Sequence, residues 1–213
     1  MQLPEVIPLF PLPNVVFFPR IPLPLHVFEP RYRAMVRDAL RGSRLIGMVL
    51  LCGDWRDDYH GRPTIFGTGT VGEIVHVEEL ADGRFNIVLR GLREFEILQE
   101  LPPHAAYREA RVRWREAPEE GLAADAREAL LTRVQRYLGR FGKTLAPDAL
   151  DPDIDGPALV NFFAQHLDVD PVEKQALLEE RSTTGRARRL VDVLEFRLRE
   201  LGAPGGSSYG RPQ

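Results

Sequence analysis

The sequence lacks the features that mark several large classes of protein. Its single cysteine, Cys52, cannot form an internal disulfide, so nothing calls for an oxidising compartment. Prolines interrupt the apolar stretches near the N-terminus, and no stretch approaches the roughly 20 residues that cross a bilayer. The first residues also lack the basic start and unbroken apolar run of a secretion signal. We therefore expect a cytoplasmic protein without a membrane as its partner.

An excess of one charge sign is also missing. The 28 basic and 31 acidic residues give a formal net charge of −3, which provides no general attraction to nucleic acid. Arg111, Arg113 and Arg115 do form a local basic stripe on an expected strand. Glutamates flank this stripe, so we expect it to be solvated and partly paired. Nucleic acid is therefore not an expected partner.

The period of the apolar residues changes near Pro118. Before it, apolar and polar residues alternate, as in residues 84–90, which is typical of half-buried strands. The Asp-Gly pair at 82–83 predicts a hairpin, because glycine tolerates a positive φ. The runs Arg44–Cys52 and Thr64–Thr68 are interpreted as additional strands. After Pro118 the apolar residues recur at steps of three and four, which predicts helices.

These patterns predict an α+β fold in two parts. Residues 1–117 would form a mostly antiparallel, pseudo-barrel-like β domain with one inserted helix that starts at Pro30. Gly91 is expected to mark a bend or bulge between two strands of this domain. Residues 118–202 would form a bundle of about four helices, with a capping box of Asp170 and Glu173 at the start of one of them and Ser182 as a helix cap. Residues 203–213, rich in Gly, Pro and Ser, would form a disordered tail.

The N-terminal segment is dense in proline, at positions 8, 11, 13, 19, 22 and 24. Proline has no backbone N–H, so we expect short extended pieces broken by turns here, and no regular central strand. The apolar residues between the prolines still need burial, and we expect most of them inside the β domain. The alternative interpretation is a groove or edge that accepts an extended peptide.

The proline-rich run from Ile7 to Pro19 (IPLFPLPNVVFFP) resembles the opening of the N-terminal domain of Lon proteases. Four further blocks resemble the same domain in the same order: Leu23–Tyr32, Gly67–Ile74, Asp82–Gly91 and Lys174–Glu179. Several separated blocks in the right order make the likeness specific. The resemblance implies a domain that selects protein substrates, without the ATPase and protease modules of the full-length enzymes. It implies a non-enzymatic binding module whose partners are unfolded or misfolded polypeptides or a partner protein.

No motif in the sequence points to catalytic chemistry. The Gly-Lys-Thr at 142–144 looks like the end of a P-loop, but Tyr137 stands where the first glycine is needed, and the preceding pattern is helical. Cys52 and His60 could pair as nucleophile and base, yet a buried strand cysteine beside a loop histidine is the more common arrangement. The histidines show no spacing typical of a metal site. We expect no catalytic residues, no metal and no cofactor.

The loop Gly53–Pro63 is the candidate contact surface. It is polar and long enough to move, and it contains the aromatic residues Trp55 and Tyr59 together with His60. Trp and Tyr side chains are enriched at binding hot spots. We therefore interpret Trp55, Tyr59 and His60 as candidate peptide-binding residues, while a plain solvated loop is equally consistent with the sequence.

Two other functions stay open. The first is a hydrolase that uses the carboxylates of Asp57 and Asp58 with His60, which requires these side chains to converge in a concave pocket. The second is a structural or oligomerising protein in which the apolar stripe of the last helix pairs with a second copy. Both a monomer and a dimer are consistent with the sequence.

Overall fold

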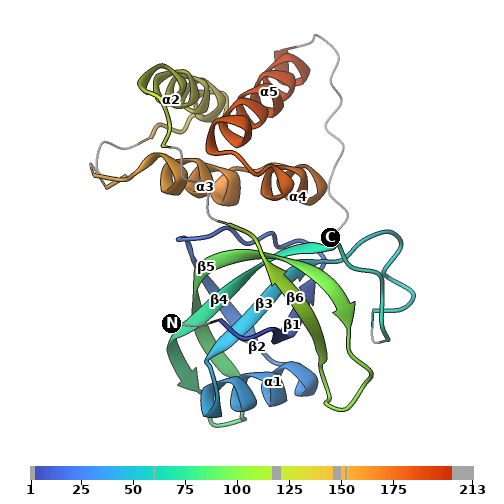
Figure 1. Ribbon diagram of the computed structural model, residues 1–213. Helices are drawn as coiled ribbons and strands as arrows, with labels where there is room; N and C mark the ends of the chain where they lie inside the picture. The colour runs from blue at the N-terminus through green and yellow to red at the C-terminus, as the bar shows by residue number, and fades with distance from the viewer. Residues whose placement is uncertain (1–2, 60, 117–120, 146–149, 152, 203–213) are drawn as a thin grey trace.

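The computed structural model describes residues 3–59, 61–116, 121–145, 150–151 and 153–202. Six strands and five helices lie within this part of the chain (Figure 1). The strands are β1 Val6–Leu12, β2 Pro22–Val27, β3 Leu45–Leu50, β4 Thr68–Glu79, β5 Phe85–Glu100 and β6 Arg108–Trp114. The helices are α1 Pro30–Arg41, α2 Ala124–Gly139, α3 Gly156–His166, α4 Pro171–Glu179 and α5 Thr183–Gly202.

All six strands belong to one sheet, in the order β2-β5-β4-β3-β1-β6. β1 runs parallel to β3 and the other pairings are antiparallel, which confirms the prediction of a mostly antiparallel β part with one inserted helix, α1. β5 also pairs with β6, so β1, β3, β4, β5 and β6 form a closed cycle, while β2 pairs with β5 outside it. The sheet is therefore mixed and is not a clear barrel. The predicted strand at 64–68 is reduced to one bridge between Leu51 and Ile65.

The prediction that proline keeps the N-terminal segment out of the interior of the sheet is wrong. β1 lies between β3 and β6 although it contains Pro8 and Pro11. Residues 6–8 pair only with β6, residues 10–12 pair only with β3, and Leu9 between them pairs with both. Each proline therefore lies where β1 pairs on one side, and its missing N–H need not interrupt a ladder. The apolar residues between the prolines are mostly buried, as predicted, among them Leu9, Phe10, Val16 and Phe18.

Gly91 does not separate two strands, although the predicted bulge is present. β5 continues through it, and its pairing with β4 shifts from Val71–Arg93 to Gly72–Gly91 at this point. A Cβ at Gly91 would lie 2.4 Å from the carbonyl oxygen of Phe18. Glycine is needed because the backbone of residues 18–21 lies against Gly91 and leaves no room for a side chain.

Side-chain caps fix the starts of the last three helices. Asp170 and Glu173 form the predicted capping box at α4, and Ser182 accepts a backbone N–H at the start of α5, as predicted for a cap. Asp155, which was not predicted, caps α3. The Gly-Lys-Thr at 142–144 begins three residues after the last residue of α2, with its glycine at φ 65°, so it lies just past a helix end, as the helical pattern before it predicted.

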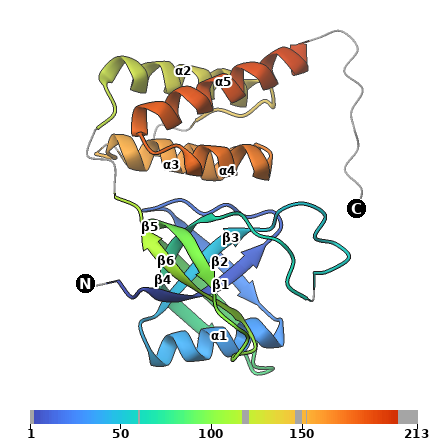
Figure 2. The same cartoon turned by 45° about the vertical axis from the view of Figure 1, so that its right-hand side comes forward.

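The elements are stacked in layers (Figures 1 and 2). α1 covers one end of the sheet, α3 and α4 lie across the opposite end, and α2 and α5 form an outer pair above them. One apolar cluster joins the sheet to the helices, with Phe18 and Leu50 on one side and Leu159, Leu178 and Leu190 on the other. Because burial of this shared surface stabilises both parts, the sheet and the helices pack as one body.

The chain changes from strand to helix between β6 and α2. The predicted boundary at residue 118 and the predicted disordered tail, 203–213, lie outside the described residues. Among the described helices, none is both long and apolar enough to cross a membrane.

Candidate functional site

The loop 53–63 projects from the sheet (Figures 1 and 2), and its second half is anchored at two places. At the first, the Tyr59 hydroxyl donates a hydrogen bond to the Glu29 carboxylate at 2.8 Å. Arg31 donates to the Tyr59 carbonyl at 3.1 Å, and its guanidinium lies 5.3 Å from the centre of the Tyr59 ring. Burial and the hydrogen bond to Glu29 raise the pKa of the Tyr59 hydroxyl, so it stays a neutral donor at neutral pH.

The second anchor, at the C-terminal end of the loop, is made by arginines. Arg62 donates to Glu100 at 3.0 Å, and Arg108 donates to Glu100 at 2.6 Å and to the Pro63 carbonyl at 2.7 Å. Burial alone would raise the pKa of Glu100, but the hydrogen bonds from Arg108 and Arg62 outweigh it and lower that pKa. A cavity of about 280 Å³ lies beside this end of the loop, lined in part by Arg62, Arg108 and the segment 101–107.

The structure brings two of the three predicted peptide-binding residues together. The Trp55 and Tyr59 rings meet edge to face with their centroids 5.9 Å apart, and the Arg56 guanidinium lies 5.1 Å from the Trp55 ring. Both rings are half-buried. His60, the third predicted residue, lies outside the described residues. The loop therefore presents a partly exposed aromatic pair, one member of which, Tyr59, is anchored to Glu29 and Arg31.

The carboxylates that the hydrolase interpretation requires are exposed. Asp57 and Asp58 both face solvent, and Asp58 accepts a hydrogen bond from the backbone N–H of Arg62 at 3.2 Å. Neither lines the cavity beside the loop. In the described part of the chain, no group of three or more His, Cys, Asp or Glu side chains could hold a metal ion. The two described members of the proposed hydrolytic group therefore do not converge in a pocket.

Phe28 is an exposed aromatic residue that the sequence patterns did not single out. It directly precedes Glu29, the partner of Tyr59, and 59% of it is exposed. Its apolar neighbours in the N-terminal segment are mostly buried, so apolar character alone could not distinguish it. Phe28 is therefore an exposed aromatic side chain next in sequence to Glu29, the residue that anchors Tyr59.

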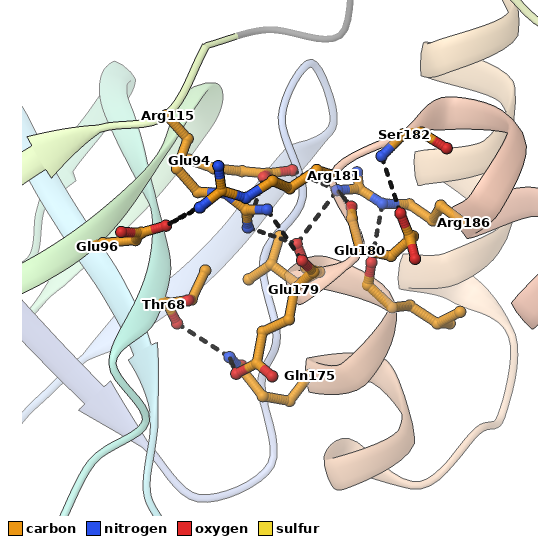
Figure 3. Close-up of polar contacts among 12 residues, drawn as sticks. Thr68, Glu94, Glu96, Arg115, Gln175, Glu179, Glu180, Arg181, Ser182 and Arg186 are labelled. Carbon is orange, nitrogen blue, oxygen red and sulfur yellow. Dashed lines mark hydrogen bonds and ion pairs between the residues drawn. The ribbon is translucent and has the colours of Figure 1, made fainter.

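A buried ionic cluster lies between the sheet and the helices (Figure 3). Glu94 of β5 lies 3.1 Å from the Arg115 guanidinium and 2.6 Å from the Arg186 guanidinium of α5. Each of the three residues is less than a tenth exposed. The cluster links β5, the end of β6 and α5, and carries one positive charge in excess.

The two arginines of this cluster also bind the C-terminal end of α4. Arg115 donates to the carbonyls of Leu178 and Glu179 at 3.0 and 2.9 Å, and Arg186 donates to the carbonyl of Leu177 at 2.9 Å. The last carbonyls of a helix have no partner within it and carry the negative end of its dipole. The cluster therefore fixes the end of α4 against the sheet.

Sequence patterns missed this cluster. Arg111 and Arg113 pair with glutamates at the surface, as expected, but Arg115 is buried because the helices cover the sheet at its position. A signal for Arg186 was present: it stands four residues before Leu190, on the apolar stripe of α5. A charged residue on such a stripe predicts a buried partner.

The apolar stripe of α5 is already covered within the chain. Leu190, Leu194 and Leu198 are buried in the same apolar cluster as residues of α2, α3 and α4. The surface that would pair with a second copy in the oligomerising alternative is therefore used for internal packing.

Two solved structures share this architecture. A Lon N-terminal domain protein from Xanthomonas campestris superposes with a TM-score of 0.64 at 23% identity, covering 88% of this chain and 97% of that one. The N-terminal domain of a Lon protease from the Mycobacterium avium complex gives 0.63 at 19% identity, covering 90% and 98%. The fold is therefore that of Lon N-terminal domains.

The sequence identifies the family directly. Residues 6–195 match the profile of the ATP-dependent protease La (LON) substrate-binding domain, and the chain belongs to this family. Lon protease 2 of Myxococcus xanthus is 31% identical over 205 residues, and Lon protease of Anaeromyxobacter dehalogenans is 31% identical over 209. Each alignment covers 94% of this chain and 24% of the relative. The chain thus spans about a quarter of the length of these curated relatives.

Proposed function

We propose that this chain is a non-enzymatic module that binds unfolded polypeptides or exposed segments of a partner protein. Membership of a substrate-binding domain family over residues 6–195 is the observation that carries the proposal. The matched relatives are Lon proteases, and this chain aligns with about a quarter of their length. The proposed role is therefore recognition of polypeptides in the cytoplasm, separate from ATP hydrolysis and peptide cleavage.

We place the polypeptide contact on the loop 53–63. An aromatic pair, Trp55 and Tyr59, can cover the apolar side chains that an unfolded polypeptide exposes, because Trp and Tyr provide large contact areas at low entropic cost. Tyr59 is anchored by Glu29 and Arg31, which supports the loop without help from a partner. His60, which directly follows Tyr59 in the sequence, belongs to the proposed contact surface as well.

Retention of polypeptides by the immobilised full chain tests the proposal. A reduced and alkylated, permanently unfolded polypeptide should be retained, whereas the same polypeptide in its native disulfide-bonded form should pass through. Trp55→Ala should weaken binding about thirtyfold or more, because truncating a hot-spot aromatic costs about 2 kcal/mol or more.

The matched control is Phe196→Ala, which removes an aromatic side chain that is 54% exposed on α5, in another part of the fold. This variant should retain the unfolded polypeptide like the unmodified chain. Equal binding by the Trp55 and Phe196 variants would show that the loop is not the contact. Failure to retain any unfolded polypeptide at low and high salt would contradict the proposed function itself.

A further inference from the structure

A second cavity, of about 140 Å³, lies between the sheet and the helices. Its residues come from the N-terminal segment, β5, the end of β6, α3 and α5. Part of the wall is apolar, formed by Pro19, Leu92, Pro157 and Val160. Since a cavity of about 150 Å³ accommodates a benzene-sized molecule, this space suits a single apolar side chain.

The remaining wall carries positive charge in excess. Four arginines and two glutamates line the cavity: Arg20, Arg93, Arg115, Arg186, Glu94 and Glu116. Glu94 is shared by the two buried arginines, and Arg20 pairs at the surface with Asp155. Arg93 is exposed, and no ion pair with another described residue engages it. With Arg20 paired to Asp155 and with Glu94 and Glu116 counted, one positive charge is left over in the wall, which favours an anionic group in the cavity.

Thr183 supplies an unused donor in the same wall. It is 3% exposed, and its Oγ1 has no hydrogen-bond partner among the described residues. Buried hydroxyls are normally hydrogen-bonded, so an unsatisfied one in a cavity wall indicates a place for a ligand acceptor. Thr183 is also the first residue of α5, where the helix dipole favours negative charge.

We propose that this cavity binds the C-terminal residue of a polypeptide. The terminal carboxylate would accept hydrogen bonds from Thr183 and Arg93, and an apolar terminal side chain would pack against Leu92 and Val160. An internal Asp or Glu side chain offers the same carboxylate, but it would leave the apolar wall without a partner. This inference rests on the proposed polypeptide-binding function and names the part of the polypeptide that is recognised.

Titration of the ¹⁵N-labelled full chain with three small probes, followed by two-dimensional NMR, tests the inference. N-acetyl-leucine, which carries a terminal carboxylate and an apolar side chain, should shift the amide signals of Leu92, Val160 and Thr183. N-acetyl-leucinamide, which lacks the carboxylate, should bind at least tenfold more weakly. N-acetyl-glutamic acid α-amide, which carries only a side-chain carboxylate, should also bind more weakly than N-acetyl-leucine.

Two variants with matched controls locate the site. Thr183→Val should weaken N-acetyl-leucine binding about tenfold, because it removes a hydrogen bond to a charged group. Its melting temperature should not fall, because the hydroxyl that it removes has no partner in the unliganded chain. Thr184→Val, at the half-exposed neighbour, should bind normally. Arg93→Gln should weaken binding as well, and Arg136→Gln, on exposed α2 surface, should not.

Each departure from this pattern overturns the inference. Equal binding of N-acetyl-leucine and its amide would exclude carboxylate recognition, and tighter binding of the glutamic acid amide would exclude a C-terminus. Normal binding by both the Thr183 and Arg93 variants would place the site elsewhere. If unfolded polypeptide is retained equally with a free or an amidated C-terminus, the cavity inference fails while the proposed function stands. If N-acetyl-leucine binds but no polypeptide is retained, both fail.

Discussion

Removal of the Arg186 guanidinium tests whether the buried ionic cluster holds the helices on the sheet. Arg186→Met keeps most of the length of the side chain and removes its charge. The guanidinium pairs with Glu94 and donates to Asn161 and to three backbone carbonyls near the end of α4, those of Leu177, Leu178 and Glu180. All of these contacts are lost together in the variant.

The expected loss in the free energy of unfolding depends on the charges that stay buried after the substitution. Loss of one partner from a buried ion pair typically costs about 3–5 kcal/mol, because the other charge is left without compensation. Here Glu94 keeps Arg115 at 3.1 Å, so the cost should fall at the lower end, at about 3 kcal/mol. Glu94→Gln should be destabilising for the same reason. The double variant should show a coupling of about 1–3 kcal/mol between the two residues.

Equilibrium unfolding in urea at pH 7, followed by circular dichroism, measures the loss. With a denaturant dependence of about 2–3 kcal/mol per molar for a domain of this size, the midpoint should fall by about 1 M. Arg188→Met, at an exposed position two residues along α5, is the control and should change stability by less than about 0.5 kcal/mol. A loss below about 1 kcal/mol for Arg186→Met, the range of surface ion pairs, would refute the reasoning.

Three further predictions concern the sheet and the loop. Gly69→Ala should cost roughly 1–3 kcal/mol in urea unfolding, because the new Cβ would lie 2.3 Å from a backbone carbonyl oxygen, whereas Gly67→Ala meets nothing within 4 Å and serves as the control. The pKa of Glu100 is lower in the folded chain than its ordinary value of 4.5, so the unfolded chain takes up the proton first as the pH falls. The free energy of unfolding should therefore decrease as the pH drops below about 4.5 toward the pKa of the folded chain. Glu100→Gln should flatten this part of the dependence of unfolding on pH. Tyr59→Phe removes the hydroxyl that anchors the loop and should speed amide hydrogen exchange in residues 53–59, with a global loss of about 1 kcal/mol.

Each of these has an outcome that would contradict it. Equal stability of the two glycine variants would show that β3 and β4 can separate to admit a methyl group. An unchanged acid limb in the Glu100 variant would assign the pH dependence to other carboxylates. Unchanged exchange in the Tyr59 variant would show that Arg31 and the Trp55 ring hold the loop without the hydroxyl.

Local signals predicted the elements of the fold well. The hairpin between β4 and β5, the capping box at Asp170 and the cap at Ser182 depend on residues within a few positions of one another, so the sequence displays them directly. The loop 53–63 was found in the same way, from aromatic residues in a polar stretch. That Glu29 anchors Tyr59 depends on a contact between residues 30 positions apart, which no local pattern displays.

The sequence by itself determined the change from strands to helices, the starts of α4 and α5, and the family. Each of these depends on residues that lie close together along the chain. Only the tertiary structure decided that β1 enters the sheet parallel to β3 and that Glu94, Arg115 and Arg186 are buried together. Glu94 and Arg186 are 92 positions apart, and alternation in β5 predicts only which face Glu94 occupies. Whether that face meets water or a helix depends on where the chain returns, and here α4 and α5 return to cover it.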